Sequence, residues 1–245
     1  MVNIDNVYQK VLAIANKEQR GYITPQEFNL FANQAQMDIF EQYFYDLNQF
    51  NRMPTNDTTH ADMVTLLNEK IDHFEKYRAA VDMSNGSGVG ILPDYYKMGQ
   101  VFYYDTNDKY VEVEKINQND IHHIQNSPLT KPSVTRPVYV RFSTAGDNQS
   151  NRERRIQIYP TAITSRVQCN YIAKPATVKW TYVVINNKAI HNSGASDLQN
   201  FELHASEEQE LVLKILQLAG VSIQDFQLAQ IASTKEVNNI NNEKQ

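Results

Sequence analysis

The stretch 155–184 constrains the fold of this chain more than any other part of the sequence. Three runs within it alternate apolar and polar residues with the period of two that is typical of half-buried strands. The runs cover 155–159, 166–173 and 178–184. Pro160 and Pro175 follow the first two runs, and proline ends a strand because it has no N–H to donate to a neighbour. The stretch therefore predicts a β-rich centre for the fold.

Helical patterns lie on both sides of this centre. Apolar residues at steps of three and four predict an amphipathic helix over 3–18. Thr24, Pro25 and Glu27 form a capping box that predicts the start of a second helix, which runs to about Phe50. Further patterns predict a third helix that ends near Val81, a short helix over 119–126, and a C-terminal pair over 206–219 and 222–231, with Gly220 just after the first of the pair.

Together these patterns predict an α+β protein with a helical N-terminal region, a central antiparallel sheet or sandwich of about six strands, and a helical C-terminal region. Further strands are expected at 100–104, 110–116 and 137–143. The expected divisions are a helical region over 1–84, a β-rich domain over 85–205, a helical pair over 206–233 and a flexible tail over 234–245. The glycine-rich run 85–90 predicts a flexible hinge between the first two.

No pattern in the sequence predicts chemistry. The run Gly86–Gly90 lacks the lysine and the preceding strand of a phosphate-binding loop. His122 and His123 diverge on a helix, so they and Asp120 are expected to be polar surface. Residues 105–108 lack the glycine and glutamate of a calcium loop and predict a hairpin turn. We therefore expect no catalytic residues, no cofactor and no metal ion, and the chain is predicted not to be an enzyme.

Composition limits the partners and the setting of the chain. Its net charge is −5 and its pI is about 5.7, so no global field favours nucleic acid. Its only cysteine, Cys169, cannot form an internal disulfide, which predicts folding in a reducing cytoplasm and a buried thiol. The sequence shows no signal peptide and no membrane span. Asparagine and glutamine fill about 45 positions, which suits wet protein–protein contacts and is equally typical of an AT-rich genome.

Two surfaces are candidates for partner contacts. The polar loop 144–154 is too long for a tight hairpin and ends in an arginine cluster, which indicates either a solvated tip or a contact with an acidic partner or passing DNA. The aromatic face of the helix over 28–50 is wider than one core contact needs, which predicts core on one side and an interface on the other. The candidate interface residues are Arg152, Arg154, Arg155, Tyr43, Phe44 and Phe50.

The order of short elements resembles a virion structural protein of tailed bacteriophages, and more narrowly the ring or head–tail connector proteins of crAss-like and related podoviruses. The similarity spans most of 1–232. The residues that carry it are 21–36 (GYITPQEFNLFANQAQ), 91–96 (ILPDYY), 127–132 (SPLTKP), 158–160 (IYP), 171–175 (YIAKP) with Trp180, and 213–221 (LKILQLAGV).

The resemblance implies a structural subunit of a closed homo-oligomeric ring, twelve-fold by likeness to the family. Its expected partners are the portal and other neck or tail ring proteins, with DNA passing through the channel without sequence-specific binding and with no membrane contact. The implied location is the virion neck or tail, after assembly in the host cytoplasm. Another reading from the residues is a fibre or baseplate module that recognises carbohydrate or a host surface, which exposed Trp and Tyr clusters on a sheet face would favour.

Overall fold

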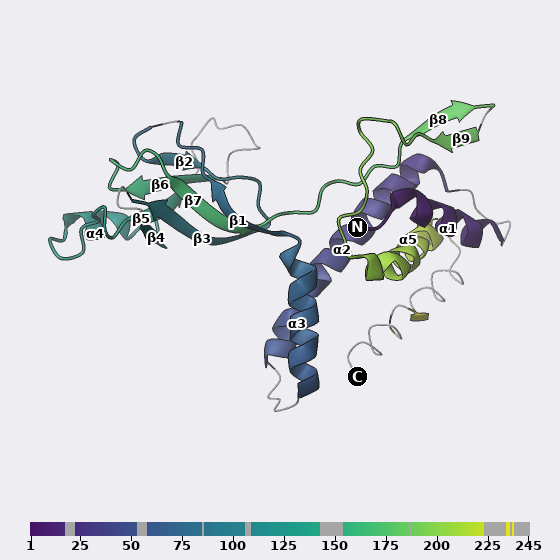
Figure 1. Cartoon of the computed structure of the whole chain (residues 1–245), viewed down its shortest axis with the longest axis horizontal. Coiled ribbons are helices and arrows are strands. Elements are labelled where there is room, and N and C mark those ends of the chain that lie inside the picture. Colours follow the sequence, from purple (N-terminus) through teal and green to yellow (C-terminus); the bar gives the residue numbers. More distant parts are fainter. Residues whose placement is uncertain are drawn as a thin grey trace. The chain divides into compact units, whose positions relative to one another are not determined.

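The computed structural model describes residues 1–17, 23–52, 58–84, 86–105, 109–142, 154–186, 188–222, 234–235 and 237 (Figure 1). The chain forms two compact units. We call the first the helical unit; it combines 1–73 with 175–245. We call the second the β unit; it is the continuous segment 74–174. The β unit begins and ends earlier than the β-rich region expected from sequence, but the predicted α+β class is confirmed.

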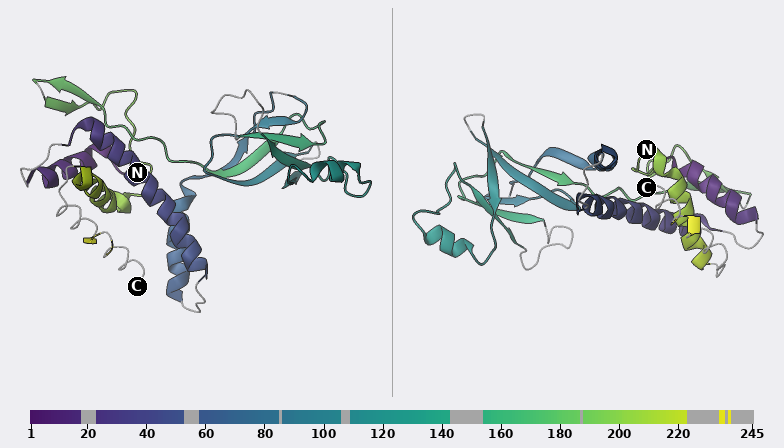
Figure 2. Two further views of the ribbon diagram at one scale, coloured as in Figure 1. Left: turned by 180° about the vertical axis from the view of Figure 1, so that it is seen from behind. Right: turned by 90° about the horizontal axis from the view of Figure 1, so that it is seen from below.

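The helical unit is built on the long helix α2 (Pro25–Arg52). Its other helices are α1 (Ile4–Lys17), α3 (Thr58–Asp72), the 3-10 turn η1 (Ala205–Glu207) and α5 (Glu208–Ser222). Helix α5 packs against α1 and α2, and α3 packs against α2 (Figure 2). The predicted second C-terminal helix over 222–231 and most of the predicted tail lie outside the described residues.

The apolar stripes expected from sequence form the core of this unit. Buried side chains from α1, α2 and α5 include Ile4, Val7, Val11, Phe28, Ala35, Ile39, Leu211, Ile215 and Leu216. The capping box at α2 is confirmed: Thr24 N donates to Glu27 Oε2 at 2.9 Å, and Glu27 N donates to Thr24 Oγ1 at 3.3 Å. The bonds that the Glu27 carboxylate accepts from Thr24 N and from Thr24 Oγ1 lower the pKa of Glu27. Helix α5 continues through Gly220 to Ser222, so the predicted stop at Gly220 is wrong.

The third helix ends earlier than predicted. Its stripe residues Leu67, Ile71 and Phe74 are buried, but α3 stops at Asp72 and the chain enters strand β1 (Glu75–Ala80). The prediction of helix to Val81 is therefore wrong. From Ala79 onward the pattern changes to alternation, because Ala79 and Val81 face the sheet core while the side chains between them do not.

Seven strands form the sheet of the β unit. After β1 come β2 (Val89–Ile91), β3 (Lys97–Tyr104), β4 (Tyr110–Lys115), β5 (Val138–Phe142), β6 (Arg155–Tyr159) and β7 (Val167–Ile172). Their order is β1-β7-β3-β4-β5-β6-β2, and each neighbouring pair is antiparallel except β4 and β5, which are parallel. The sheet is thus mixed, with one strand more than expected and one pair of the opposite sense.

Hydrogen bonds join the two ends of this sheet. Asp82, just after β1, and Ile91, at the end of β2, exchange both backbone bonds at 3.1 and 2.8 Å. The sheet therefore curls until its edges meet, which leaves no open edge at this point. The interior holds one apolar cluster that includes Val101, Tyr139 and Ile158. On the outer side, the short helix α4 (Ile121–Asn126) covers β5 through Ile121, Val138 and Val140.

The glycine run is a packed turn within the β unit and not the predicted hinge. Gly88 has φ +76° and its carbonyl accepts a bond from Ile158 N at 2.8 Å. A Cβ at Gly88 would lie 2.6 Å from Ile158 O, and one at Gly90 would lie 2.7 Å from Met83 Sδ. These glycines are needed because the turn lies directly against β6 and the core.

The last of the three strand-like runs does not join the sheet. Residues 176–180 run beside α2 in the helical unit, and only Tyr182–Ile185 form a strand, β8. It pairs with β9 (Lys188–His191) in a separate two-stranded hairpin. Asn186, where a turn is predicted, has φ +50° between the paired strands.

Candidate interaction surfaces

The predicted arginine cluster does not lie in one place that can be described. Arg152 and most of the loop 144–154 lie outside the described residues. Arg155 opens β6, and Arg154 accepts a backbone bond from Leu92 at 2.7 Å. The guanidinium of Arg154 lies 3.8 Å from the carboxylate of Asp94. Arg155 therefore lies in the strand predicted over 155–159, and Arg154, at the end of the predicted loop, is bonded to the sheet through Leu92.

The aromatic face of α2 divides between core and surface. Tyr43 is buried, and Lys70 of α3 lies 5.5 Å from the centre of its ring. Tyr43 therefore cannot offer its ring to a partner in this structure. Phe44 packs edge-on against Phe40 at 5.0 Å and is half-buried, as is Phe50. Whether Phe44 and Phe50 meet a partner stays a prediction.

One face of α2 holds the extended segment 176–180 through side-chain amides. Asn33 accepts from Val178 N at 2.8 Å and donates to Val178 O at 3.0 Å. Asn29 makes the same pair of bonds to Trp180, at 2.8 and 3.2 Å. Gln36 donates to Ala176 O at 2.9 Å. Residues 29, 33 and 36 share one face of the helix. Their side chains hydrogen-bond to the backbone of every second residue of the segment, as a neighbouring strand would do with its backbone.

Trp180 anchors the hairpin that follows this segment. Its ring is 1% exposed and lies 4.0 Å from Tyr8, 5.7 Å from Tyr182 and 5.7 Å from His191, measured between ring centres. The prediction that Trp180 is core is confirmed. The indole N–H donates to Asp5 Oδ1 at 2.9 Å. The base of the hairpin is thus fixed to α1 through buried rings and one carboxylate.

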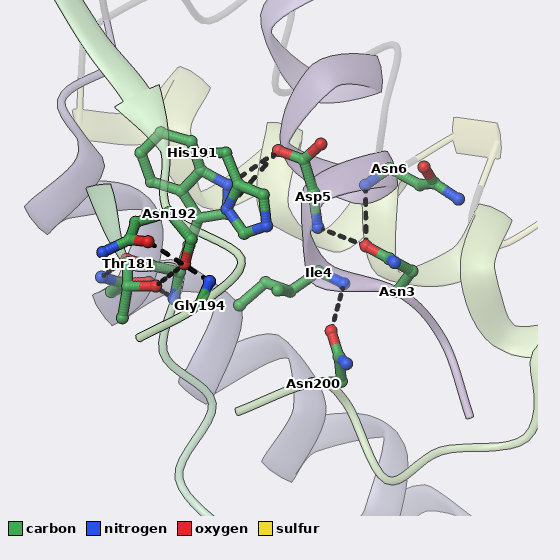
Figure 3. A network of polar contacts seen from close by, with 11 residues as sticks. Asn3, Ile4, Asp5, Asn6, Thr181, His191, Asn192, Gly194 and Asn200 are labelled. Atoms are coloured by element: carbon green, nitrogen blue, oxygen red, sulfur yellow. Dashed lines mark hydrogen bonds and ion pairs between the residues drawn. The ribbon is translucent and has the colours of Figure 1, made fainter. Parts of the chain in front are cut away.

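Polar contacts around the anchor tie distant segments together. Figure 3 shows Asp5 beside His191, whose Nδ1 lies 4.0 Å from Asp5 Oδ1. Thr181 Oγ1 donates to Asn192 O at 2.8 Å, and Asn200 Oδ1 accepts from Ile4 N at 3.1 Å at the start of α1. Amide groups therefore satisfy backbone within the fold here, a use that the sequence count alone did not reveal.

Beyond the anchor the hairpin carries an apolar surface. We call residues 182–191 the hairpin arm; it projects from the helices of its unit (Figure 1). Val183 pairs with Ile190, and the side chains of Val183, Val184, Ile185 and Ile190 are between 46% and 61% exposed. Lys188 is the only Lys, Arg, Asp or Glu on its described strands. Such a surface is typical of a contact with another protein.

A second surface lies on the outside of the β unit. We call it the aromatic–arginine face; its members are Tyr77, Arg78, Phe102, Tyr104, Tyr110 and Arg166. On strands β3, β4 and β7 the side chains of Val101, Val113 and Cys169 point into the core. Because side chains alternate along a strand, the neighbours of each of these residues point outward. Tyr104 pairs with Tyr110, and Phe102 pairs with Glu112. Glu114 lies on the same side of β4 as Glu112, and Arg136 lies 3.6 Å from its carboxylate.

The rings and guanidinium groups of this face lie next to one another in a row. Arg78 lies between two rings, with its Cζ 4.8 Å from the centre of Tyr77 and 4.2 Å from that of Tyr110. The ring centre of Tyr110 lies 4.8 Å from that of Tyr104, and Arg166 Cζ lies 6.0 Å from the ring centre of Tyr104. Tyr77 is 70% exposed and Tyr110 is 43% exposed. Rings that contact a guanidinium bind its flat faces, and its N–H groups lie in its own plane, where an anion can accept from them.

Both arginines of the face have a left-handed backbone. Arg78 has φ +54° and Arg166 has φ +60°, a conformation that costs a non-glycine residue about 1–2 kcal/mol. Asn170 Oδ1 accepts from Arg78 N at 2.9 Å and holds it at a bulge in β1, between Lys76 and Ala79. Strain that is maintained by such contacts tends to occur where a side chain is aimed for function.

A small pocket adjoins the face at the same bulge. Its volume is about 190 Å³, and it is lined by residues of β1, β3 and β7 that include Lys76, Tyr77, Lys97, Asn170 and Glu75. Gly99 is required on its wall because a Cβ there would lie 2.8 Å from Asn170 O. The lysines add positive charge beside Arg78.

The described residues contain no group of three or more His, Cys, Asp or Glu side chains placed to hold a metal ion. Among the helices of the described part of the chain, none is both long and apolar enough to cross a bilayer. His122 and His123 lie exposed on α4. Cys169 is fully buried, as predicted, and burial raises its pKa to about 11.

The sequence prediction missed both surfaces. Tyr77 and Arg78 fall where a helix was predicted, so their place beside Tyr110 could not be seen. A signal did exist at the turn of β3 and β4, since Phe102, Tyr104 and Tyr110 alternate onto one side of two strands that were predicted to pair.

No protein-family model matches the chain, and no curated protein matches it either.

Proposed function

We propose that this chain is a structural subunit of an oligomeric ring in the neck or tail of a tailed bacteriophage, where it binds the portal or neighbouring ring proteins around the DNA channel. The resemblance carried by 21–36, 91–96 and 213–221 supports the class of protein. The hairpin arm is the observation that carries an assembly role. The proposal includes no catalytic step and no cofactor.

The hairpin arm supports assembly because a two-stranded ribbon is only marginally stable in water on its own. Its aliphatic side chains at Val183, Val184, Ile185 and Ile190 are between 46% and 61% exposed. Burying each against a partner would contribute roughly 1 kcal/mol, from about 25 cal/mol for each Å² of apolar surface removed from water. Its long polar anchor at Asp5 and Trp180 fixes the base while leaving this surface for a neighbour.

The second candidate function is a fibre or baseplate module that binds carbohydrate. The exposed rings of Tyr77 and Tyr110 on one sheet face favour it. However, Arg78 lies over one side of each ring. The N–H groups of its guanidinium form stronger hydrogen bonds with an anion than with a neutral sugar. A glycan array tests this candidate: saturable binding of a neutral glycan that is lost in Tyr77→Ala would favour it over a ring subunit.

The assembly proposal is tested by native mass spectrometry and negative-stain microscopy of the purified chain, alone and with virion fractions. We expect a closed ring, twelve-fold by the family resemblance, or incorporation into virions. Val184→Asp and Ile190→Asp should weaken assembly at least tenfold, because they place a charge in the apolar contact. Leu129→Asp, at a fully solvated site of the β unit, is the matched control and should have no effect. A strict monomer that is absent from virions contradicts the proposal.

A further inference from the structure

The two units carry opposite net charge. The β unit, 74–174, holds 13 Lys and Arg against 10 Asp and Glu, a net charge of +3. The rest of the chain forms the helical unit and holds 10 against 18, a net charge of −8. Fields of opposite sign on two parts of one chain favour contacts between the β unit of one copy and the helical unit of another.

The helical unit presents an acidic stripe that matches the aromatic–arginine face in chemistry. We call Leu30, Gln34, Asp38, Glu41 and Tyr45 the α2 stripe; its members follow one another at steps of three and four, so they share one side of the helix. Leu30, Gln34, Glu41 and Tyr45 are exposed. The stripe thus combines two carboxylates with an aliphatic and an aromatic side chain.

The carboxylates of the α2 stripe differ from others in the same unit in their ion-pair partners. Glu207 pairs with Lys70 at 2.7 Å, and Glu208 pairs with Lys10 at 2.7 Å. Asp38 accepts a neutral bond from Gln34 at 2.7 Å, and within the part of the chain that the structure describes neither Asp38 nor Glu41 has a Lys or Arg partner. Among the residues of the helical unit that the structure describes, the negative charge of the stripe is therefore not compensated.

We propose that the aromatic–arginine face of one copy docks on the α2 stripe of a second copy. This inference rests on the proposed function and names the surfaces that would join neighbours in the ring. The in-plane N–H groups of Arg78 and Arg166 would donate to Asp38 and Glu41 of the second copy. The tyrosine rings would pack on Leu30 and Tyr45, and Tyr and Arg are the residue types that dominate binding energy at interfaces.

The two surfaces differ, so the contact is head-to-tail. Each copy would offer its face to one neighbour and its stripe to the other, which is the condition for a cyclic assembly. The left-handed backbone at Arg78 and Arg166 then has a reason: it places both guanidinium groups on the outer side of the sheet, where the second copy lies.

The test is a charge exchange in the full chain, followed by native mass spectrometry and sedimentation. The pair Arg78→Glu and Arg166→Glu should weaken assembly at least tenfold, and the pair Asp38→Lys and Glu41→Lys should do the same, because like charges then meet. The variant that carries all four changes restores the opposite signs and should assemble within about threefold of wild type. Lys115→Glu with Lys131→Glu, and Glu69→Lys with Asp72→Lys, are exposed matched controls that should leave assembly unchanged.

A further variant separates folding from docking. Arg78→Gly removes the guanidinium, but glycine accepts φ +54° without strain, so the β unit keeps or gains stability. Circular dichroism and thermal unfolding should match wild type while assembly falls at least tenfold. An assembly constant equal to that of wild type would overturn the inference.

The remaining outcomes distinguish the inference from the function on which it rests. If wild type is a strict monomer and absent from virions, the proposed function fails first. If wild type assembles and the Arg78→Glu, Arg166→Glu pair assembles equally well, the function stands and the inference fails. If both double variants lose assembly and the four-residue variant does not regain it, these two surfaces do not meet and the inference is overturned.

Discussion

The side chain of Trp180 shows how one buried residue joins distant parts of the helical unit. It is the only tryptophan of the chain, so its fluorescence reports on this unit alone. Its indole N–H is satisfied by Asp5, and its ring stacks on Tyr8, Tyr182 and His191. A buried donor that loses its acceptor costs the folded state the full desolvation free energy of that group. The stability of the helical unit therefore depends strongly on this one hydrogen bond.

We expect Asp5→Ala to lower the free energy of unfolding by about 1–3 kcal/mol, because the indole N–H is left buried without an acceptor. Urea denaturation followed by Trp180 fluorescence measures the change. Asp5→Asn is the matched control, since its amide oxygen keeps an acceptor at the same place, and it should lose less than half as much. Equal losses in both variants would show that the charge of Asp5, and not its bond to Trp180, stabilises the anchor.

At the scale of elements, the least conventional contact of the fold is the set of side-chain hydrogen bonds between α2 and 176–180, which we call the amide ladder. Asn29, Asn33 and Gln36 supply side-chain donors and acceptors where a sheet would supply backbone. A helix cannot offer its own backbone to a strand, because its N–H and C=O groups are already bonded along the helix. Amide side chains solve this, since each carries one acceptor and two donors.

Replacing Asn33 with leucine should destabilise the helical unit by about 2–4 kcal/mol, because both backbone groups of Val178 lose their partner. Hydrogen exchange is the direct measurement: the amide of Val178 should exchange much faster, while core amides of the β unit should not change. Asn48→Leu, an exposed amide near the end of the same helix, is the control and should leave exchange at Val178 as it was. Unchanged exchange in Asn33→Leu would mean that the amide ladder is not what protects this segment.

The elements whose pattern agrees with their surroundings were predictable from sequence. Helices α1 and α2, the β3–β4 pair and the strands β6 and β7 follow stripes or alternations that survive in the structure. Strand β1 was not predictable, because the helical period of Leu67, Ile71 and Phe74 continues up to its first residue. Its extended form is set by pairing with β7, which lies about a hundred residues away along the chain.

The interaction surfaces were harder to predict for the same reason. The aromatic–arginine face joins Arg78 to Tyr110 and Tyr104 across strands β1, β7, β3 and β4, and no local window contains them. The run 178–184 has a strand pattern, but its partners are helix side chains, a ring stack and a hairpin mate. Local alternation reports which side chains are half-buried and not what buries them.

At the scale of the whole molecule, the β unit is an insertion into the helical unit. The chain leaves α3, builds all seven strands and returns at Pro175 to complete the helical core. The ends of the insertion meet, since Ala173 N donates to Phe74 O at 2.8 Å. Adjacent ends and a core of its own are the features of a segment that folds independently.

We therefore expect the isolated fragment 74–174 to fold cooperatively, with its closed sheet intact. Cys169 provides the readout, because burial raises its pKa to about 11 from 9.0. At pH 8 this lowers the reactive thiolate fraction about 100-fold, so a thiol reagent should react at least 100 times more slowly than with unfolded fragment. The full chain is the control and should give the same rate. Rapid labelling of Cys169 in the fragment without denaturant would show that the sheet of the β unit needs the helical unit in order to form.

The insertion also sets an order of events during synthesis. Helices α1 and α2 leave the ribosome first, but α5, which packs against both, and the segment that holds Trp180 are made only after the β unit is complete. The β unit is then able to close while α1 and α2 still lack α5, so the apolar side chains that these two helices pack against α5 stay uncovered through the synthesis of more than a hundred residues. Apolar surface exposed in this interval makes the nascent chain prone to aggregation until α5 is made.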